Sequence, residues 1–154
     1  MKNIITLEGY DEITSLFSKL KLEKEHWVRE KQIAAQQGDR SENAEYICAK
    51  ANIRDIDKRL YRINWILNNT RAVNIKDRKK SDKVLFGSTV KLLKDDTEEL
   101  TVKIVGTHEL IYIQKITECL CISNISPLGK RLMRKEVDDD VDINKFNYEI
   151  LEIK

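Results

Sequence analysis

The sequence has few of the residues that interrupt helices. It contains one proline, Pro127, and five glycines among 154 residues. Residues 1–75 contain only Gly9 and Gly38 and no proline, so long helices can run there without a break. No apolar run approaches the ~20 residues that a membrane span needs. An acidic residue, Glu8, comes too early for the apolar core of a signal peptide. We therefore expect a cytoplasmic protein with no membrane association.

Cysteine and histidine are also scarce. The cysteines are odd in number and lack metal-ligand spacing: Cys48, Cys119 and Cys121. This predicts reduced thiols in a cytosolic protein, acting as small buried apolar side chains. The two histidines are not clustered and no glycine-rich phosphate loop occurs, which argues against a nucleotide hydrolase. A net charge of only +2 predicts no polyanionic partner by itself, so local charge clusters must decide.

The first half of the chain has the periodicity of two long helices. From Ile13 onward, apolar residues fall on one helical face. After Gly38, a seam with alternating spacings of three and four residues follows: Tyr46, Ala49, Ile53, Ile56, Leu60, Ile63 and Leu67. Two such faces joined near Gly38 bury each other only if the helices fold back antiparallel. We predict an antiparallel coiled-coil hairpin over residues 1–75, with its tip at 36–45 and arms of ~45 Å.

The second half has a different composition and periodicity. Residues 76–83 carry five basic and two acidic side chains and no apolar one, which predicts a solvated basic linker. Beyond it, strands are expected at 84–87, 89–93, 100–105, 119–125 and 148–153. Ser126 followed by Pro127 predicts a short helix that continues to Met133. The predicted fold class is α+β, with a helical hairpin followed by a small antiparallel sheet and one short helix over residues 84–154.

The turn of the hairpin contains two carboxylates three residues apart, in the segment Gly38-Asp39-Arg40-Ser41-Glu42-Asn43-Ala44-Glu45-Tyr46. One interpretation is a capping box, in which Asp39 accepts backbone N–H bonds and Glu42 reaches back to the cap. The other is that the tip presents both carboxylates to a partner. There they would share a Mg²⁺ whose other ligands come from water and a phosphate-bearing substrate.

Behind the tip, the second helix carries a row of cations spaced by four: Lys50, Arg54, Lys58 and Arg62. In an antiparallel hairpin Lys31 lies level with Lys50, and Lys24 with Lys58, while Arg29 and Arg59 extend the patch. One interpretation is a solvated face with ion pairs. The other is a surface for a polyanion. Like charges four residues apart destabilise a helix, and no interaction within the helix compensates for this cost.

These residues together resemble the GreA/GreB family of bacterial transcript-cleavage elongation factors over nearly the whole chain. The tip segment carries the strongest likeness, and its Arg40-Ser41 pair is closer to GreB. Further matches follow in the family's order: Phe86-Gly87 before Val90, Ile104-Val105-Gly106, Ser126-Pro127 before Leu132, and Lys135-Glu136-Val137. The resemblance implies a coiled coil followed by an FKBP-like domain that docks on RNA polymerase.

The resemblance also implies a function for the tip. The hairpin enters the secondary channel of bacterial RNA polymerase, beside the 3′ end of backtracked RNA. Asp39 and Glu42 match the acidic tip positions that help to hold a second Mg²⁺, shared with the polymerase active site and not bound tightly by the factor alone. The polymerase cleaves the transcript, so the factor is an activator and not itself an enzyme. The expected RNA contacts are Lys50, Arg54, Lys58, Arg62, Arg29 and Lys31, and we expect a monomer.

The chain departs from the family pattern at three places. Arg131 stands where a small residue is usual, Asp138 stands where glycine is common, and residues 144–147 replace a glycine-rich turn. The acidic run at 138–142 lacks the spacing of a Ca²⁺ loop and predicts a solvated turn. An alternative function is inhibition of the polymerase through the same channel. A prolyl isomerase finds little support, because the second half has few aromatic residues.

Overall fold

The computed structural model describes residues 3–154, which form two compact units. One unit comprises residues 13–69, and the other comprises residues 3–12 together with 70–154. The predicted boundary at residue 75 differs from this division, because both ends of the predicted hairpin segment belong to the second unit. Within the described residues, no helix is long and apolar enough to cross a membrane.

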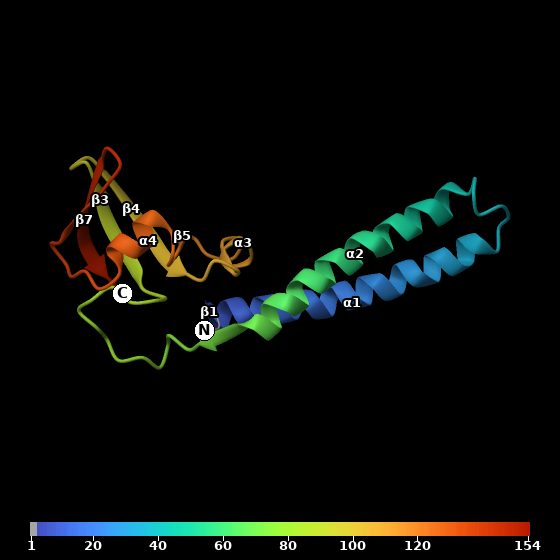
Figure 1. The fold of residues 1–154 in the computed structure, drawn as a ribbon, viewed down its shortest axis with the longest axis horizontal. Helices are drawn as coiled ribbons and strands as arrows, with labels where there is room; N and C mark the ends of the chain where they lie inside the picture. Colours follow the sequence, from blue (N-terminus) through green and yellow to red (C-terminus); the bar gives the residue numbers. More distant parts are fainter. Residues whose placement is uncertain (1–2) are drawn as a thin grey trace. The chain divides into compact units, whose positions relative to one another are not determined.

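The first unit is an antiparallel pair of helices joined by a short turn (Figure 1): α1 (Leu7–Ala35) from residue 13 onward, and α2 (Ala44–Asn69). The predicted seam of α2 is confirmed, since its members are buried or half-buried. The fully buried positions are Ala49, Ile56, Ile63 and the additional Ile66. An ion pair of 2.7 Å between Lys24 Nζ and Asp57 Oδ1 joins the two helices. The hairpin is therefore stabilised by an apolar seam, with an ion pair at the edge of that seam.

The first helix begins six residues earlier than the apolar rhythm from Ile13 suggests. Thr6 explains the difference, because its Oγ1 accepts a hydrogen bond of 3.0 Å from the backbone N–H of Gly9. A threonine that accepts from the third helical residue is a favourable N-cap. Thr6 therefore determines where α1 begins, several residues before the apolar coiled-coil face.

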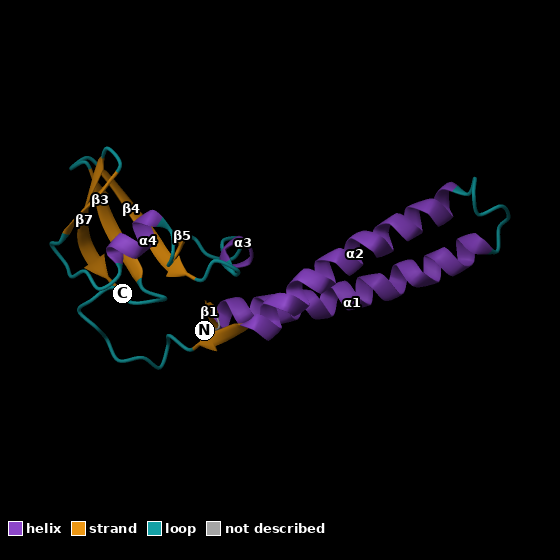
Figure 2. Ribbon diagram, viewed as in Figure 1, coloured by secondary structure: helices purple, strands orange, loops and turns teal. Residues whose placement is uncertain are grey.

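The second unit contains a five-stranded sheet in the order β5-β4-β3-β7-β6 (Figure 2). Its strands are β3 (Thr89–Lys94), β4 (Glu98–Val105), β5 (Leu120–Ser123), β6 (Asp140–Ile143) and β7 (Phe146–Ile153). The prediction of a wholly antiparallel sheet is wrong for one pair, because β4 and β5 run parallel. A parallel pair needs a long crossover. Residues 106–119 provide it and contain the short helix α3 (Leu110–Ile113).

The predicted short helix is confirmed as α4 (Pro127–Leu132). Ser126 caps it, since its Oγ accepts from the Gly129 N–H at 3.0 Å and donates to the Ser123 carbonyl at 2.7 Å. The apolar side of α4 joins the sheet in a core of fully or almost fully buried residues: Val84, Val90, Leu92, Val102, Ile104, Leu132, Val141 and Ile150.

Several local predictions are wrong. Residues 84–87 are not a strand: Val84 is buried but exchanges only two backbone hydrogen bonds, with Arg134 and Lys135. Two further strands, β1 (Asn3–Thr6) and β2 (Thr70–Val73), form a parallel pair that the sequence patterns did not reveal. The solvated turn predicted at 138–142 is also wrong in part, because β6 begins at Asp140 and Val141 is buried in the core. The prediction of buried thiols holds for Cys121, whereas Cys119 is half-buried and Cys48 is exposed. Cys48 lies off the apolar seam of α2, which explains its exposure.

The two departures at expected glycine positions have a backbone explanation. Asp138 has φ +71° and Asn144 has φ +57°, both in the left-handed region that favours glycine. Aspartate and asparagine tolerate this region better than other side chains. The turns therefore keep a glycine-like backbone although their side chains differ from the family pattern.

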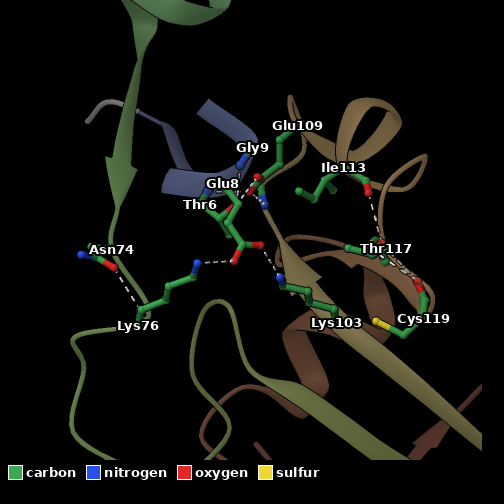
Figure 3. A network of polar contacts seen from close by, with 12 residues as sticks. Thr6, Glu8, Gly9, Asn74, Lys76, Lys103, Glu109, Ile113, Thr117 and Cys119 are labelled. Atoms are coloured by element: carbon green, nitrogen blue, oxygen red, sulfur yellow. Dashed lines mark hydrogen bonds and ion pairs between the residues drawn. The ribbon is translucent and has the colours of Figure 1, made fainter. Parts of the chain in front are cut away.

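The second unit is tied together around a buried carboxylate, Glu109 (Figure 3). Its Oε1 accepts 2.7 Å hydrogen bonds from the backbone N–H groups of Thr6 and Gly106. Its Oε2 accepts from the Thr6 hydroxyl. Beside it, Glu8 bonds Lys103 Nζ at 3.1 Å, which holds the pKa of Glu8 below its usual value. Glu109 thus joins the start of α1 to the crossover after β4.

We predict that Glu109→Ala destabilises the protein, because two buried N–H groups lose their acceptor at about 1–3 kcal/mol each. Burial raises the pKa of Glu109 above its ordinary value, although its hydrogen bonds oppose this. The folded state therefore binds the proton more tightly, and the stability from Glu109 declines as pH rises through this raised pKa. Denaturant unfolding at several pH values should show this slope in the wild type and its loss in Glu109→Gln, which keeps an acceptor. An unchanged slope in Glu109→Gln would contradict the assignment.

Candidate functional site

The tip of the hairpin is organised by Asn43. Its Nδ2 donates to the Ala34 carbonyl at 2.7 Å, near the end of α1, and its Oδ1 accepts from the Tyr46 N–H at 3.1 Å, at the start of α2. One side chain therefore satisfies backbone groups at the ends of both helices. The predicted capping box of Asp39 and Glu42 is wrong, because Asn43 holds the cap position and α2 begins only at Ala44.

Asp39 stabilises the turn itself. Its Oδ1 accepts from the Ser41 backbone N–H at 3.0 Å and from the Ser41 hydroxyl at 2.8 Å. These hydrogen bonds hold the pKa of Asp39 below its ordinary value, the backbone bond being the larger cause. Its Oδ2 makes no hydrogen bond within residues 3–154. Asp39 is thus an ionised carboxylate, oriented through one oxygen and open through the other.

Glu42 is exposed, and within the described residues 3–154 it forms no hydrogen bond or ion pair. It lines a surface depression of about 400 Å³ together with Asp39, and the other lining residues are Gln37, Asn43, Ala44 and Glu45. Among the described residues, no group of three or more potential ligands is placed to hold a metal ion. Carboxylate oxygens are suitable Mg²⁺ ligands, but these fill only part of an octahedral shell. Asp39 and Glu42 alone would therefore need further ligands from another molecule to hold such an ion.

Next to the tip, Tyr46 holds two cations. The Arg40 guanidinium lies 5.8 Å and the Lys50 ammonium 5.7 Å from the centre of its ring. Such cation–π contacts keep positive charge close to the acidic turn without neutralising it. An aromatic side chain therefore contacts cations at the boundary between the acidic tip and the basic row of α2.

Behind the tip, five of the six predicted RNA-contacting residues line one groove of about 820 Å³ along the helices. Its full lining is Lys31, Lys50, Ile53, Arg54, Asp57, Lys58, Tyr61, Arg62 and Trp65. Lys31 is therefore placed as predicted, whereas Arg29 is exposed but does not line the groove. The four cations of the α2 row form no ion pair within residues 3–154. An ion-paired face describes Lys24 and Asp57 but not this row.

The sequence analysis missed the aromatic part of this groove, Tyr61 and Trp65. A signal for them was available, because positions 54, 58, 61 and 65 are spaced 4, 3 and 4 and share a helical face outside the seam. These two rings are absent from a prediction that considers only the charged residues of α2. The groove therefore combines cations with exposed aromatic surface.

Comparison with known proteins identifies the same family in both halves of the chain. The profile described as "Transcription elongation factor, N-terminal" (GreA_GreB_N) matches residues 3–71. The profile described as "Transcription elongation factor, GreA/GreB, C-term" matches residues 79–154. The chain is 39% identical to transcription elongation factor GreA of Lachnoclostridium phytofermentans, over 99% of this chain and 96% of that protein.

Other similar proteins include both subtypes. The chain is 39% identical to transcription elongation factor GreB of Neisseria meningitidis serogroup B, over 93% of this chain and 85% of that protein. The crystal structure of GreA factor homolog 1 (Gfh1) of Thermus thermophilus covers 100% of this chain and 99% of that one, with 19% identity and a TM-score of 0.45. Equal identity to a GreA and a GreB does not separate the subtypes, so closeness to GreB stays a prediction.

The tip geometry predicts which side chain stabilises the hairpin. Asn43→Ala should lower the free energy of unfolding by about 0.5–2 kcal/mol, the usual cost of losing an N-cap. Glu42→Ala should leave it nearly unchanged, because Glu42 does not cap α2, whereas in a capping box the same change would remove one of the two reciprocal hydrogen bonds. Thermal unfolding followed by circular dichroism would measure both variants. A larger loss in Glu42→Ala than in Asn43→Ala would restore the capping-box interpretation.

Proposed function

The chain belongs to the GreA/GreB family of transcription elongation factors, and on that premise we propose that it activates transcript cleavage by RNA polymerase. The hairpin enters the secondary channel of the enzyme, and the tip reaches the 3′ end of backtracked RNA. The observation that carries the proposal is the pair Asp39 and Glu42, which line one depression and are both exempt from capping. The factor activates the polymerase's own endonuclease reaction and is not itself the nuclease.

The two carboxylates have complementary positions in this proposal. Asp39 is aimed by Ser41 and stays ionised, so its open oxygen presents a fixed negative charge. Glu42 has no partner within residues 3–154 and adapts to a site that another protein completes. Together they would hold one side of a Mg²⁺, with polymerase carboxylates and RNA phosphate supplying further oxygens. When bound, this ion supplies Lewis-acid stabilisation of the charge that develops during hydrolysis.

The basic row supports the RNA part of the proposal. Lys50, Arg54, Lys58 and Arg62 remain without acidic partners in residues 3–154 and line one groove. Phosphates of single-stranded RNA would neutralise these charges and release counterions. We place the RNA behind the tip on this surface, with the factor acting as a cytoplasmic monomer beside the polymerase.

We predict that Asp39→Ala or Glu42→Ala abolishes stimulated cleavage while polymerase binding remains. A stalled, backtracked complex with 5′-labelled RNA measures cleavage as a shortened labelled product, and competition with labelled wild type measures binding. Raising Mg²⁺ should partly rescue Asp39→Asn, because weaker retention of the shared ion is offset by mass action.

Three results of that assay would contradict the proposal. Inhibition of cleavage by the wild type would favour the channel-blocking alternative. Cleavage of RNA by the purified factor without polymerase, lost in Asp39→Ala, would make the protein a nuclease. Equal activity of Asp39→Ala and the wild type would remove the tip from the function. Gln37→Ala is a matched control, because Gln37 lines the same depression without a charge.

The basic row gives a separate prediction. Arg54→Gln combined with Lys58→Gln should weaken engagement of long backtracked RNA and flatten its dependence on salt, since fewer counterions are released. Short backtracks, whose RNA barely reaches the shaft, should change less. Cleavage titrations at several salt concentrations measure both effects, with Lys19→Gln on α1, outside the groove, as the control. An unchanged salt slope would show that the row is only solvated.

A further inference from the structure

The groove on α2 includes two aromatic side chains with exposed surface, Tyr61 and Trp65. Tyr61 is 77% exposed and Trp65 is 44% exposed, and both line the groove with Ile53. Neither ring belongs to the seam that joins the helices. Large aromatic side chains gain most of their free energy by burial, so two of them on one exposed face indicate a ligand.

The rings continue the line of the cations. Positions 54, 58, 61 and 65 share one helical face, so Arg54 and Lys58 are followed by Tyr61 and Trp65 along the axis. At ~1.5 Å per residue the groove extends about 22 Å from Lys50 to Trp65. That length accommodates several nucleotides at ~3.4 Å for each stacked base. The groove therefore places cations and aromatic rings along one line that is long enough for a short nucleotide chain.

We propose that Tyr61 and Trp65 stack unpaired bases of single-stranded RNA whose phosphates contact Lys58 and Arg54. The inference rests on the proposed function, which assigns only phosphates to this surface, and it adds contacts to the bases. Sites for single strands combine a positive groove with aromatic rings, because every base has a π-face. The expected recognition is tolerant of sequence, since stacking on an aromatic ring does not depend on which base is stacked.

The charges of the groove favour RNA over other occupants. Asp57 is the one acidic lining residue, and its ion pair with Lys24 already compensates it. The remaining charged side chains are cations from both helices: Lys31, Lys50, Arg54, Lys58 and Arg62. A duplex would meet the same cations but keep its base faces stacked internally, out of reach of the rings.

The experiment uses the full chain and two single-stranded oligomers of equal length and charge. One carries bases and the other is an abasic ribose-phosphate chain. The chain has two tryptophans, so Trp27→Phe leaves Trp65 as the only one and its fluorescence reports the groove. We expect the oligomer with bases to bind at least about five-fold more tightly and to quench Trp65, whereas the abasic oligomer binds without quenching.

Variants separate the rings from the cations. Tyr61→Ala and Trp65→Ala should remove the preference for bases and keep the salt dependence, while Tyr61→Phe should keep the preference. Arg54→Gln combined with Lys58→Gln should weaken both oligomers and flatten the salt dependence. Leu22→Ala is the matched control, because Leu22 is 66% exposed on α1 and does not line the groove.

Three results would overturn the inference: equal affinity for the two oligomers, no binding of either one, or weaker binding of Trp65→Ala to polymerase without RNA. The last would make the rings a protein contact. The titration contains no polymerase, so its outcome is independent of the cleavage assay. A wild-type protein that stacks bases but fails to stimulate cleavage would refute only the proposed function, and the reverse result would refute only the stacking.

Discussion

The functional surface of this protein depends on two hydrogen bonds made by one side-chain amide. Asn43 donates to the end of α1 and accepts from the start of α2, so backbone groups at both helix ends are satisfied without using a carboxylate. If Asp39 and Glu42 had to cap α2, their oxygens would be committed to backbone N–H groups. The amide instead leaves both acidic side chains at the surface, where another molecule reaches them. Helix capping and the proposed contacts to a ligand are therefore assigned to different residues at the tip.

Much of the architecture follows from periodicity, because burial of a seam leaves a regular trace in the sequence. The three-four spacing of the α2 seam, which includes Ala49, Ile56 and Ile63, predicted the antiparallel hairpin, and Ser126 with Pro127 predicted α4. The candidate site was harder to predict from the sequence. The spacing of Asp39 and Glu42 is compatible with a capping box, and only the competition from Asn43 excludes it. The basic row was predictable from spacing by four, whereas its continuation into Tyr61 and Trp65 mixes two chemical classes and escaped a search for charge.

The elements that sequence patterns did not reveal depend on contacts between distant residues. The parallel pairing of β4 with β5 follows from the crossover at residues 106–119, whose path no local spacing encodes. Strands β1 and β2 are four residues each and lie far apart in the sequence. Glu109 looks like an ordinary surface residue until Thr6 and Gly106 are found on its carboxylate. Buried polar networks of this kind combine short segments that carry little signal individually.

The discontinuity of the second unit has a consequence for the order in which the protein forms during synthesis. Residues 3–12 leave the ribosome before residues 13–154, and their partners β2 and Glu109 follow only after the whole hairpin has been made. The helices of residues 13–69 make contacts within one continuous stretch and are able to pair early, whereas the sheet waits for its C-terminal strand. Strand β1 therefore lacks its partners until β2 and Glu109 have been synthesised. A fragment cut at residue 75 keeps its hairpin but loses the carboxylate that secures the start of α1.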